Sequence, residues 1–177
     1  METDDRALMR RVARRDDAAF AEMVGRYGGR LLAVAGRLLS SRADAEDAVQ
    51  RTLLHCFAGA ASYRPEWAVS TWLYRILTNI CMDELRRRVT RATHDPELPL
   101  ELTPRDGREP GDDVDLRRAL ERVPREARVL LALRYVNGLS YGELARVRGI
   151  SVNTVKSQLA RGKALLRAEL GKRGVLR

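Results

Sequence analysis

The sequence predicts an all-α protein of two small helical domains joined by a flexible linker. Three observations indicate this architecture: apolar residues recur at helical spacing from about Asp16 to Val89, the composition changes between Thr90 and Asp113, and a second helical pattern begins at Val114. A chain of 177 residues can form one ordinary domain or two small ones without disulfides. The break in periodicity favours two.

The first predicted domain covers residues 1–89. Its first apolar stripe, spaced as on the buried face of a helix, comprises Phe20, Met23, Val24, Tyr27, Leu31, Ala35, Leu38 and Leu39. Another helix is predicted over 44–57, with a buried stripe of Ala45, Ala48, Val49, Thr52, Leu53, Cys56 and Phe57. We therefore expect a helical domain here.

The helix predicted over 44–57 has a mixed outward face, made of Glu46, Asp47, Gln50, Arg51 and Leu54. The helix dipole favours acids in a first turn, so Asp44, Glu46 and Asp47 need no partner to explain them. A face that is merely solvated would explain these acids, but it explains an outward leucine, Leu54, beside Gln50 less well. A face that is acidic, amide and aliphatic resembles a docking site for another helix.

A further helix is predicted over 70–88. Its inward positions are Leu73, Ile76, Leu77, Ile80, Cys81 and Leu85, whereas Arg75, Asn79, Asp83 and Arg86 align outward. This polar ladder ends in consecutive arginines, 86–88, and could follow a phosphate backbone. A cation-rich carboxyl end that favours the helix dipole explains the same arginines, and the sequence leaves both interpretations open.

The loop before this helix, residues 62–69, places Tyr63 and Trp67 near Trp72. Aromatic faces can stack on an unpaired base, with Arg64 available for its phosphate, and this chemistry suits single-stranded rather than duplex DNA. Core packing is the competing account. For Trp72, packing or a wedge against the duplex edge is favoured.

Residues 90–113 are predicted to be a solvated linker, because four of the six prolines and seven acids lie there with little periodicity. The second predicted domain covers 114–177. In it, Pro124 opens a helix and Gly138 ends it. The apolar positions of this helix are Ala127, Leu130, Leu131 and Leu133.

Two short helices joined by a tight glycine turn are predicted over 140–163. Ser140 and Glu143 have capping-box spacing, Gly149 supplies the turn, and Ser151 caps the second helix. The apolar positions of this second helix are Val155, Leu159 and Leu166. Its free side chains are suited to base edges and phosphates: Asn153, Thr154, Lys156, Ser157 and Arg161. The pattern predicts a helix-turn-helix that binds DNA.

The charge distribution agrees with a polyanionic partner. The net charge is +9 and the pI about 10.3, and residues 146–177 hold nine Lys or Arg against one acid, Glu169. A basic tail kept for solubility would explain the charge alone. Its position on the helix-turn-helix counts against that alternative.

Several function classes are disfavoured. Cys56 and Cys81 lie in apolar helical patterns, so buried free thiols are the default interpretation. His55 and Cys56 are adjacent on a helix and point to different faces, so we expect no metal ion and no cofactor. No nucleophile with a base and no phosphate loop is found, which makes an enzyme improbable. Without a spanning segment or signal peptide, we expect a cytoplasmic protein with no membrane insertion.

Taken together, these motifs resemble the extracytoplasmic function (ECF) family of RNA polymerase sigma factors. The resemblance covers most of the chain and rests on three motifs in the family's order. They are 45–50 (AEDAVQ), 71–76 (TWLYRI) with Asn79, Asp83 and 86–88, and 152–157 (VNTVKS). It implies a first domain like sigma region 2, a second like sigma region 4, and promoter-specific transcription initiation without catalytic activity.

The resemblance also implies partners. The helix over 44–57 would grip the β′ clamp coiled coil of core RNA polymerase through Asp44, Glu46, Asp47, Gln50 and Leu54. The β flap of the polymerase and promoter DNA are further partners. Regulation would come from an anti-sigma factor.

Two DNA contacts follow from the same resemblance. The loop over 62–69 would capture a flipped base of the −10 element, and the following helix would hold the melting duplex, through Tyr63, Arg64, Trp67, Trp72, Arg75, Asn79, Arg86 and Arg87. The last helix would enter the major groove of the −35 element through Ser151, Val152, Asn153, Thr154, Lys156, Ser157, Arg161 and Lys163. Asn153 would pair with an adenine edge, and Lys156, Arg161 and Lys163 would hold phosphates.

Three positions depart from the family pattern. Asn153 stands where glycine or proline is common, Gln158 where arginine is common, and Gly162 where alanine is common. A mid-helix glycine costs about 1 kcal/mol relative to alanine. A free-standing helix-turn-helix regulator that binds an operator as a dimer is the strongest rival. It explains 140–163 equally well and leaves the first-domain features unused.

Overall fold

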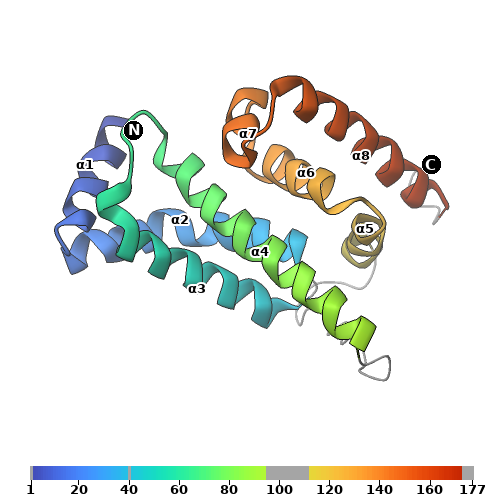
Figure 1. The fold of residues 1–177 in the computed structure, drawn as a ribbon, viewed down its shortest axis with the longest axis horizontal. Helices are drawn as coiled ribbons and strands as arrows, with labels where there is room; N and C mark the ends of the chain where they lie inside the picture. The colour runs from blue at the N-terminus through green and yellow to red at the C-terminus, as the bar shows by residue number, and fades with distance from the viewer. Residues whose placement is uncertain (1, 40, 95–111, 173–177) are drawn as a thin grey trace.

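The computed structural model describes residues 2–39, 41–94 and 112–172, and these form helices without strands (Figure 1). The all-α prediction is confirmed. The elements are α1 (Glu2–Ala13), α2 (Asp17–Leu38), α3 (Arg42–Gly59), the 3-10 turn η1 (Ala60–Ser62), α4 (Val69–His94), α5 (Asp112–Glu121), α6 (Arg125–Asn137), α7 (Tyr141–Arg148) and α8 (Val152–Lys172).

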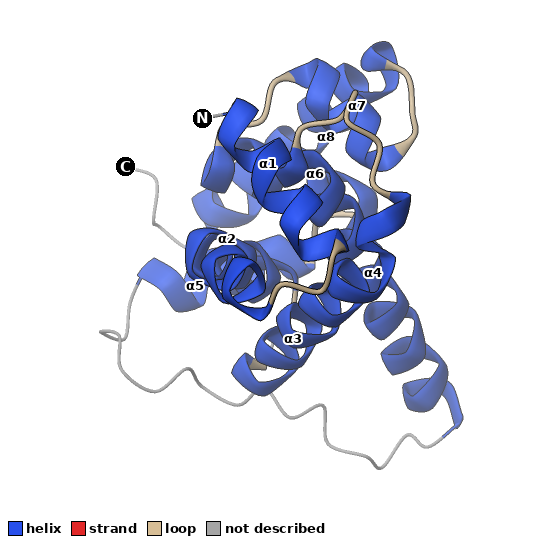
Figure 2. Cartoon of the chain, turned by 90° about the vertical axis from the view of Figure 1, so that its left-hand side faces the viewer, coloured by secondary structure: helices blue, strands red, loops and turns tan. Residues whose placement is uncertain are grey.

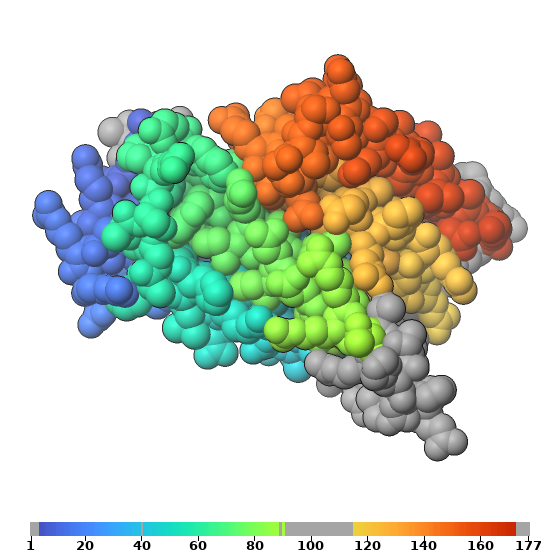
Figure 3. Space-filling view, in the orientation of Figure 1, coloured from blue at the N-terminus to red at the C-terminus, as the bar shows by residue number. Residues whose placement is uncertain are grey.

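The helices form two bodies that pack against each other (Figures 1 and 2). In the first body, α2 packs against α3 and α4, and α3 packs against α4. In the second body, α8 packs against α5, α6 and α7. Between the bodies, α6 packs against α2 and α7 packs against α4, so the orange surface of α7 abuts the green surface of α4 (Figure 3).

The predicted buried stripe of α2 is confirmed except at two positions: Phe20 is only half-buried, and Val24 is exposed. Met23, Tyr27 and Leu31, four residues apart, are buried in the core. Val24 was expected beside them and is 37% exposed, so that expectation was wrong. Val24 lies one residue past this line, about 100° around the helix, where no other helix covers it fully.

The first helix, α1, lies outside the predicted periodicity, which began at Asp16. Leu8, Met9 and Val12 are buried at helical spacing and pack it onto the first body. This short pattern was present in the sequence but surrounded by charges.

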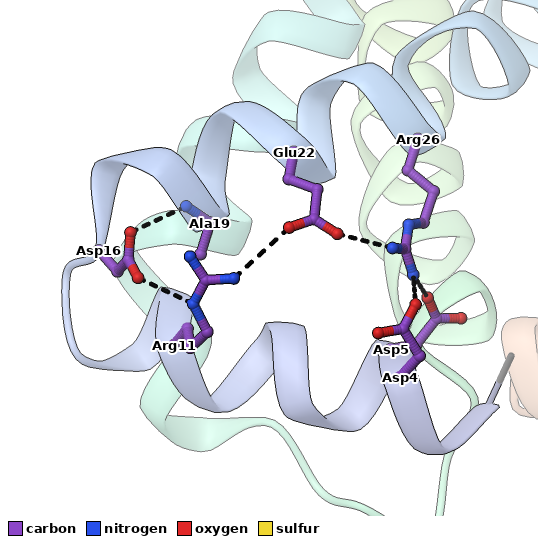
Figure 4. Close-up of polar contacts among 7 residues, drawn as sticks. All are labelled: Asp4, Asp5, Arg11, Asp16, Ala19, Glu22 and Arg26. Atoms are coloured by element: carbon purple, nitrogen blue, oxygen red, sulfur yellow. Dashed lines mark hydrogen bonds and ion pairs between the residues drawn. The ribbon is translucent and has the colours of Figure 1, made fainter.

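Those charges tie α1 to α2 (Figure 4). Arg26 on α2 donates to Asp5 at 2.5 Å and to Glu22 at 2.7 Å, while Arg11 on α1 pairs with Asp16 at 2.9 Å. Asp16 caps α2 by accepting from the Ala19 N–H at 2.9 Å. This hydrogen bond, helped by Arg11, lowers the pKa of Asp16.

Both ends of the linker predicted over 90–113 are helical in the structure. Helix α4 continues to His94, and α5 already begins at Asp112. The remaining part, 95–111, lies outside the described residues. No helix among the described residues is long and apolar enough to span a membrane.

Helix α6 is buried on every side from Ala127 to Leu133. Its buried residues are consecutive: Ala127, Arg128, Val129, Leu130, Leu131, Ala132 and Leu133. A helix at the surface of a body buries one stripe, so a helix buried all round must lie between two neighbours. The neighbours are α8 of its own body and α2 of the other.

Candidate DNA and polymerase interfaces

The helix-turn-helix forms as the sequence predicts. Ser140 Oγ accepts from the Glu143 N–H at 3.3 Å, and the Ser140 N–H donates to the Glu143 carboxylate at 2.7 Å. This capping box starts α7, and Gly149 ends it in the left-handed region at φ 67°. Ser151 then starts α8 by accepting from the Thr154 N–H at 3.0 Å. Because these hydrogen bonds are local, the sequence alone was sufficient to predict them.

The predicted recognition residues of α8 lie on its outward side. Those that are exposed are Ser151, Val152, Asn153, Lys156, Ser157 and Arg161. Thr154 and Lys163 are half-buried, and the Thr154 hydroxyl shares a hydrogen bond with Ser151 Oγ at 2.9 Å. Val155 and Leu159 are buried and fix the rotation of α8. The polar side chains are thus presented together on a rigid helix.

The packing of α8 against α6 explains why residue 162 is a glycine. A Cβ built on it would stand 3.0 Å from Ala127 Cβ and 3.2 Å from Leu131 Cδ1, both on α6. Such contacts are tighter than almost all real ones, so glycine lets α8 and α6 approach closely. This departure from the family pattern concerns packing between helices.

The face of α3 predicted to dock on polymerase is open. Glu46, Asp47 and Gln50 are exposed, and Leu54 is 56% exposed. The opposite stripe is buried, from Ala45 to Cys56. Within the helix, Arg42 pairs with Glu46 at 2.7 Å, an exposed pair that water screens.

Asp44 differs from the rest of this face. It is half-buried and forms an ion pair with Arg88 of α4, which also contacts Glu84 at 3.5 Å. Its carboxylate therefore joins α3 to α4. Arg88 is held by this internal contact, whereas Arg86 and Arg87 are exposed at the end of the ladder.

The aromatic loop is partly packed and partly open. The rings of Tyr63 and Trp72 lie 5.5 Å apart, and the Tyr63 hydroxyl donates to the Trp67 carbonyl at 2.5 Å. The Arg75 guanidinium lies 5.1 Å from the centre of the Trp67 ring. Tyr63, Trp67 and Trp72 are half-buried and Arg64 is exposed. The structure thus brings the predicted loop residues together with the first turns of α4.

The polar ladder of α4 is outward as predicted. Arg75, Asn79, Asp83 and Arg86 are exposed. Asp83 accepts from Arg86 at 2.7 Å, an exposed pair one turn apart. Leu73, Leu77, Ile80 and Cys81 are buried, while Ile76 and Leu85 are half-buried. Burial raises the pKa of Cys81 and of Cys56 to about 12, so both are protonated thiols at neutral pH.

The arrangement of two helical bodies with these faces agrees with comparisons to known proteins. The family model for Sigma-70 region 2 matches residues 23–91, and the model for Sigma-70, region 4 matches residues 113–166. Over 173 residues the chain is 35% identical to the ECF RNA polymerase sigma factor SigM of Mycobacterium tuberculosis (strain H37Rv), covering 96% of this chain and 86% of SigM. This chain belongs to the ECF sigma factors.

This sigma factor is similar to other members and to solved structures. It is 28% identical to SigW of Bacillus subtilis over 184 residues, covering 96% of this chain and 98% of SigW. CnrH in complex with the cytosolic domain of CnrY matches with a TM-score of 0.74 and 27% identity, over 95% of this chain and 97% of that chain. RpoE in complex with the anti-sigma factor NepR, from Bartonella quintana, matches with a TM-score of 0.75 and 27% identity. The match covers 86% of this chain and 96% of the RpoE chain. As an ECF sigma factor, the protein directs promoter-specific transcription initiation.

The sigma factor also has contacts that sequence reasoning missed. Arg148, the last residue of α7, donates to Glu126 at 2.7 Å and reaches Thr78 and Asn79 of α4 at 3.4 and 3.5 Å. Arg128 donates to the carbonyls of Glu121 and Val123 and so closes the end of α5. Nothing in the local sequence pattern marks either arginine as buried, because the acceptors lie outside the helix that carries the arginine.

Proposed function

We propose that the protein binds core RNA polymerase through the exposed face of α3 and reads promoter DNA through two separate surfaces, without catalytic activity of its own. The observation that carries this proposal is the exposure of the Leu54 side chain. It is 56% exposed on a well-packed helix, on the same outward face as the acidic and amide side chains of Asp47 and Gln50. An exposed leucine with polar neighbours suits a helix-docking site, here the β′ clamp coiled coil.

The first DNA surface is the loop 62–69 with the outward side of α4. Tyr63 and Trp67 are close enough to form one side of a base pocket, and Arg75 and Arg64 supply positive charge beside it. Stacking on aromatic rings suits an unpaired base of the −10 element. Unstacking a base costs a few kcal/mol, so binding energy from polymerase and backbone contacts must offset it.

The second DNA surface is the outward side of α8. Its exposed polar residues leave the amino-terminal turns free to enter the major groove of the −35 element. Asn153 is exposed and would bond an adenine edge, whereas Arg161, also exposed and about two turns later, would bind a phosphate.

Regulation is proposed to come from a protein partner. CnrH and RpoE, which this chain resembles in fold, were solved in complex with CnrY and with the anti-sigma factor NepR. We assign an anti-sigma factor and the β flap of polymerase as further partners. Since bacterial transcription takes place in the cytoplasm, the proposal places the protein there.

The test is transcription from a promoter library by purified protein mixed with core polymerase that lacks any other sigma factor. Transcripts that start at a shared promoter sequence are expected. Sequence-specific binding by a dimer that never associates with polymerase would instead favour a free-standing regulator. Leu54→Lys in the same assay is expected to abolish transcripts while α8 still binds duplex DNA.

A further inference from the structure

Arg15, in the short connection between α1 and α2, has an unusual backbone conformation. Its φ is 64°, and among the residues that the structure describes it is the only one other than glycine in the left-handed region. Its N–H donates to the Val12 carbonyl at 2.9 Å, and the N–H of Asp16 donates to the Arg11 carbonyl at 3.2 Å. These two hydrogen bonds end α1 in a Schellman motif, in which the left-handed position is usually a glycine. An arginine is disfavoured there, because its Cβ crowds the backbone.

The connection that carries Arg15 is fixed on both sides. Before it, the Schellman motif closes the end of α1. After it, Asp16 accepts from the Ala19 N–H and from the Arg11 guanidinium, both at 2.9 Å (Figure 4). The backbone of Arg15 is therefore held between two capped helix ends, and its side chain starts from a fixed point.

The Arg15 side chain contacts the end of α3, 42 positions later in the chain. One guanidinium nitrogen donates to the Phe57 carbonyl at 3.0 Å, and the guanidinium carbon lies 4.6 Å from the centre of the Phe57 ring. The last carbonyls of a helix need partners from outside it, and a positive charge is favoured at this end. Helix α3 has no lysine or arginine in its own last turn. Arg15 therefore supplies the C-terminal cap that α3 lacks.

The loop proposed to capture a base begins directly after this capped end. The turn η1 follows α3, and α1 packs against it, so the segment that leads to α4 runs beside α1 (Figure 1). In η1 the Ala60 carbonyl accepts from the Tyr63 N–H at 3.2 Å. The Tyr63 hydroxyl in turn donates to the Trp67 carbonyl. A continuous series of contacts thus leads from Arg15 to the aromatic residues of the loop.

We propose that Arg15 is a positioning residue for the base pocket: by capping α3 it sets the direction in which the chain enters the loop 62–69. The proposal rests on the proposed function, in which Tyr63 and Trp67 take up an unpaired base of the −10 element. Stacking depends on how the rings overlap, so the pocket selects a base best when its rings are ordered beforehand. Arg15 acts through α3 and does not need to touch DNA.

The first experiment measures the order of the loop in the isolated protein. Both tryptophans of the protein, Trp67 and Trp72, lie at this loop, so quenching of their fluorescence by acrylamide reports on it. Arg15→Gly removes the side chain but suits the left-handed backbone, so its thermal midpoint should stay within about 4 °C of the wild type. Quenching is expected to increase in Arg15→Gly. Arg15→Lys, which keeps a charged donor, and Arg14→Ala, which removes the neighbouring exposed charge, should resemble the wild type.

The second experiment measures base capture by each variant bound to core polymerase. The probe is single-stranded DNA with the −10 sequence of a promoter obtained from the library, compared with the same strand lacking one base at each position in turn. The largest ratio of affinities identifies the captured base. In Arg15→Gly this ratio should fall by roughly threefold to tenfold, the range that corresponds to one net hydrogen bond. The salt dependence should stay unchanged, because no phosphate contact is lost.

Base discrimination decides the outcome. If Arg15→Gly keeps the wild-type ratio, the positioning role is wrong, whether or not quenching or the thermal midpoint changes, because Arg15 would then be a structural cap only. A salt slope shallower by about one, with the ratio intact, would instead show that Arg15 binds a phosphate directly. That result also overturns the proposal.

Failure of the proposed function is distinguishable from failure of this inference. If the wild-type protein transcribes from the library but Arg15→Gly discriminates bases as the wild type does, only the positioning role is wrong. If the wild type selects no promoter, the proposed function is wrong, and so is a base pocket positioned by Arg15. Quenching then still shows whether Arg15 orders the loop.

Discussion

Gly162 of α8 lies so close to α6 that a Cβ built on it would stand 3.0 Å from the Cβ of Ala127. The contact joins the DNA-reading helix to the helix that packs on the first body. A Cβ atom is fixed by its own backbone and cannot rotate away. The backbones of α6 and α8 must therefore move apart to admit a larger residue at position 162. Glycine at this position therefore lowers the helix propensity of α8 but allows α8 and α6 to pack closely.

Gly162→Leu is expected to lower the free energy of unfolding by about 2 kcal/mol or more, because overpacking forces the two helices apart. Urea unfolding followed by circular dichroism measures it. Gly171→Ala is the control on the same helix, where nothing lies within 4 Å, and it should be neutral or slightly stabilising. Equal effects at both glycines would show that the close approach does not matter.

Asn153→Ala is expected to relax base preference at one upstream position, since it removes a side chain suited to an adenine edge. Arg161→Ala should weaken binding to all sequences alike. It should also make the slope of log K against log salt concentration shallower by about one, because one phosphate contact is lost. Binding to a randomised −35 library at several salt concentrations distinguishes these. An equal loss at every sequence for Asn153→Ala would refute base reading.

Leu54→Ala is expected to weaken binding to core polymerase without unfolding the protein, because the side chain is 56% exposed. Val24→Ala, at another exposed large apolar side chain of the first body, serves as the matched control. Affinity for core polymerase and the thermal midpoint are measured for both. A loss of affinity shared by the two variants would argue against a specific docking face on α3.

The capping box of α7 should respond to acid. The Ser140 hydroxyl and N–H donate to Glu143 and lower its pKa. A lowered pKa in the folded state gives stability that is complete above the unfolded value of about 4.3 and is lost as pH falls through the folded value.

Ser140→Ala is therefore expected to cost about 1 kcal/mol at pH 7. The difference from the wild type should shrink at a pH well below the unfolded value of about 4.3, as the pH falls through the lowered pKa of Glu143 and its carboxylate becomes protonated in the folded wild type as well. Urea unfolding at the two pH values measures this. A difference that stays constant with pH would mean that the carboxylate contributes nothing to the cap.

The sequence by itself determined the features that depend on near neighbours in the chain. Helical periodicity predicted α2, α3 and α4, and the spacing of Ser140, Glu143, Gly149 and Ser151 predicted the helix-turn-helix, because the hydrogen bonds of these residues reach only three or four positions along the chain. The outward faces of α3, α4 and α8 followed from the same periodicity.

Tertiary structure decided what depends on residues far apart. The exposure of Val24, the ion pair between Asp44 and Arg88, and the burial of Arg148 against Thr78 each involve helices distant in sequence. Periodicity shows which side of a helix is apolar but not which helix covers it. The packing of α6 between α2 and α8 is therefore a property of the folded chain, since only there do both of its apolar sides find partners.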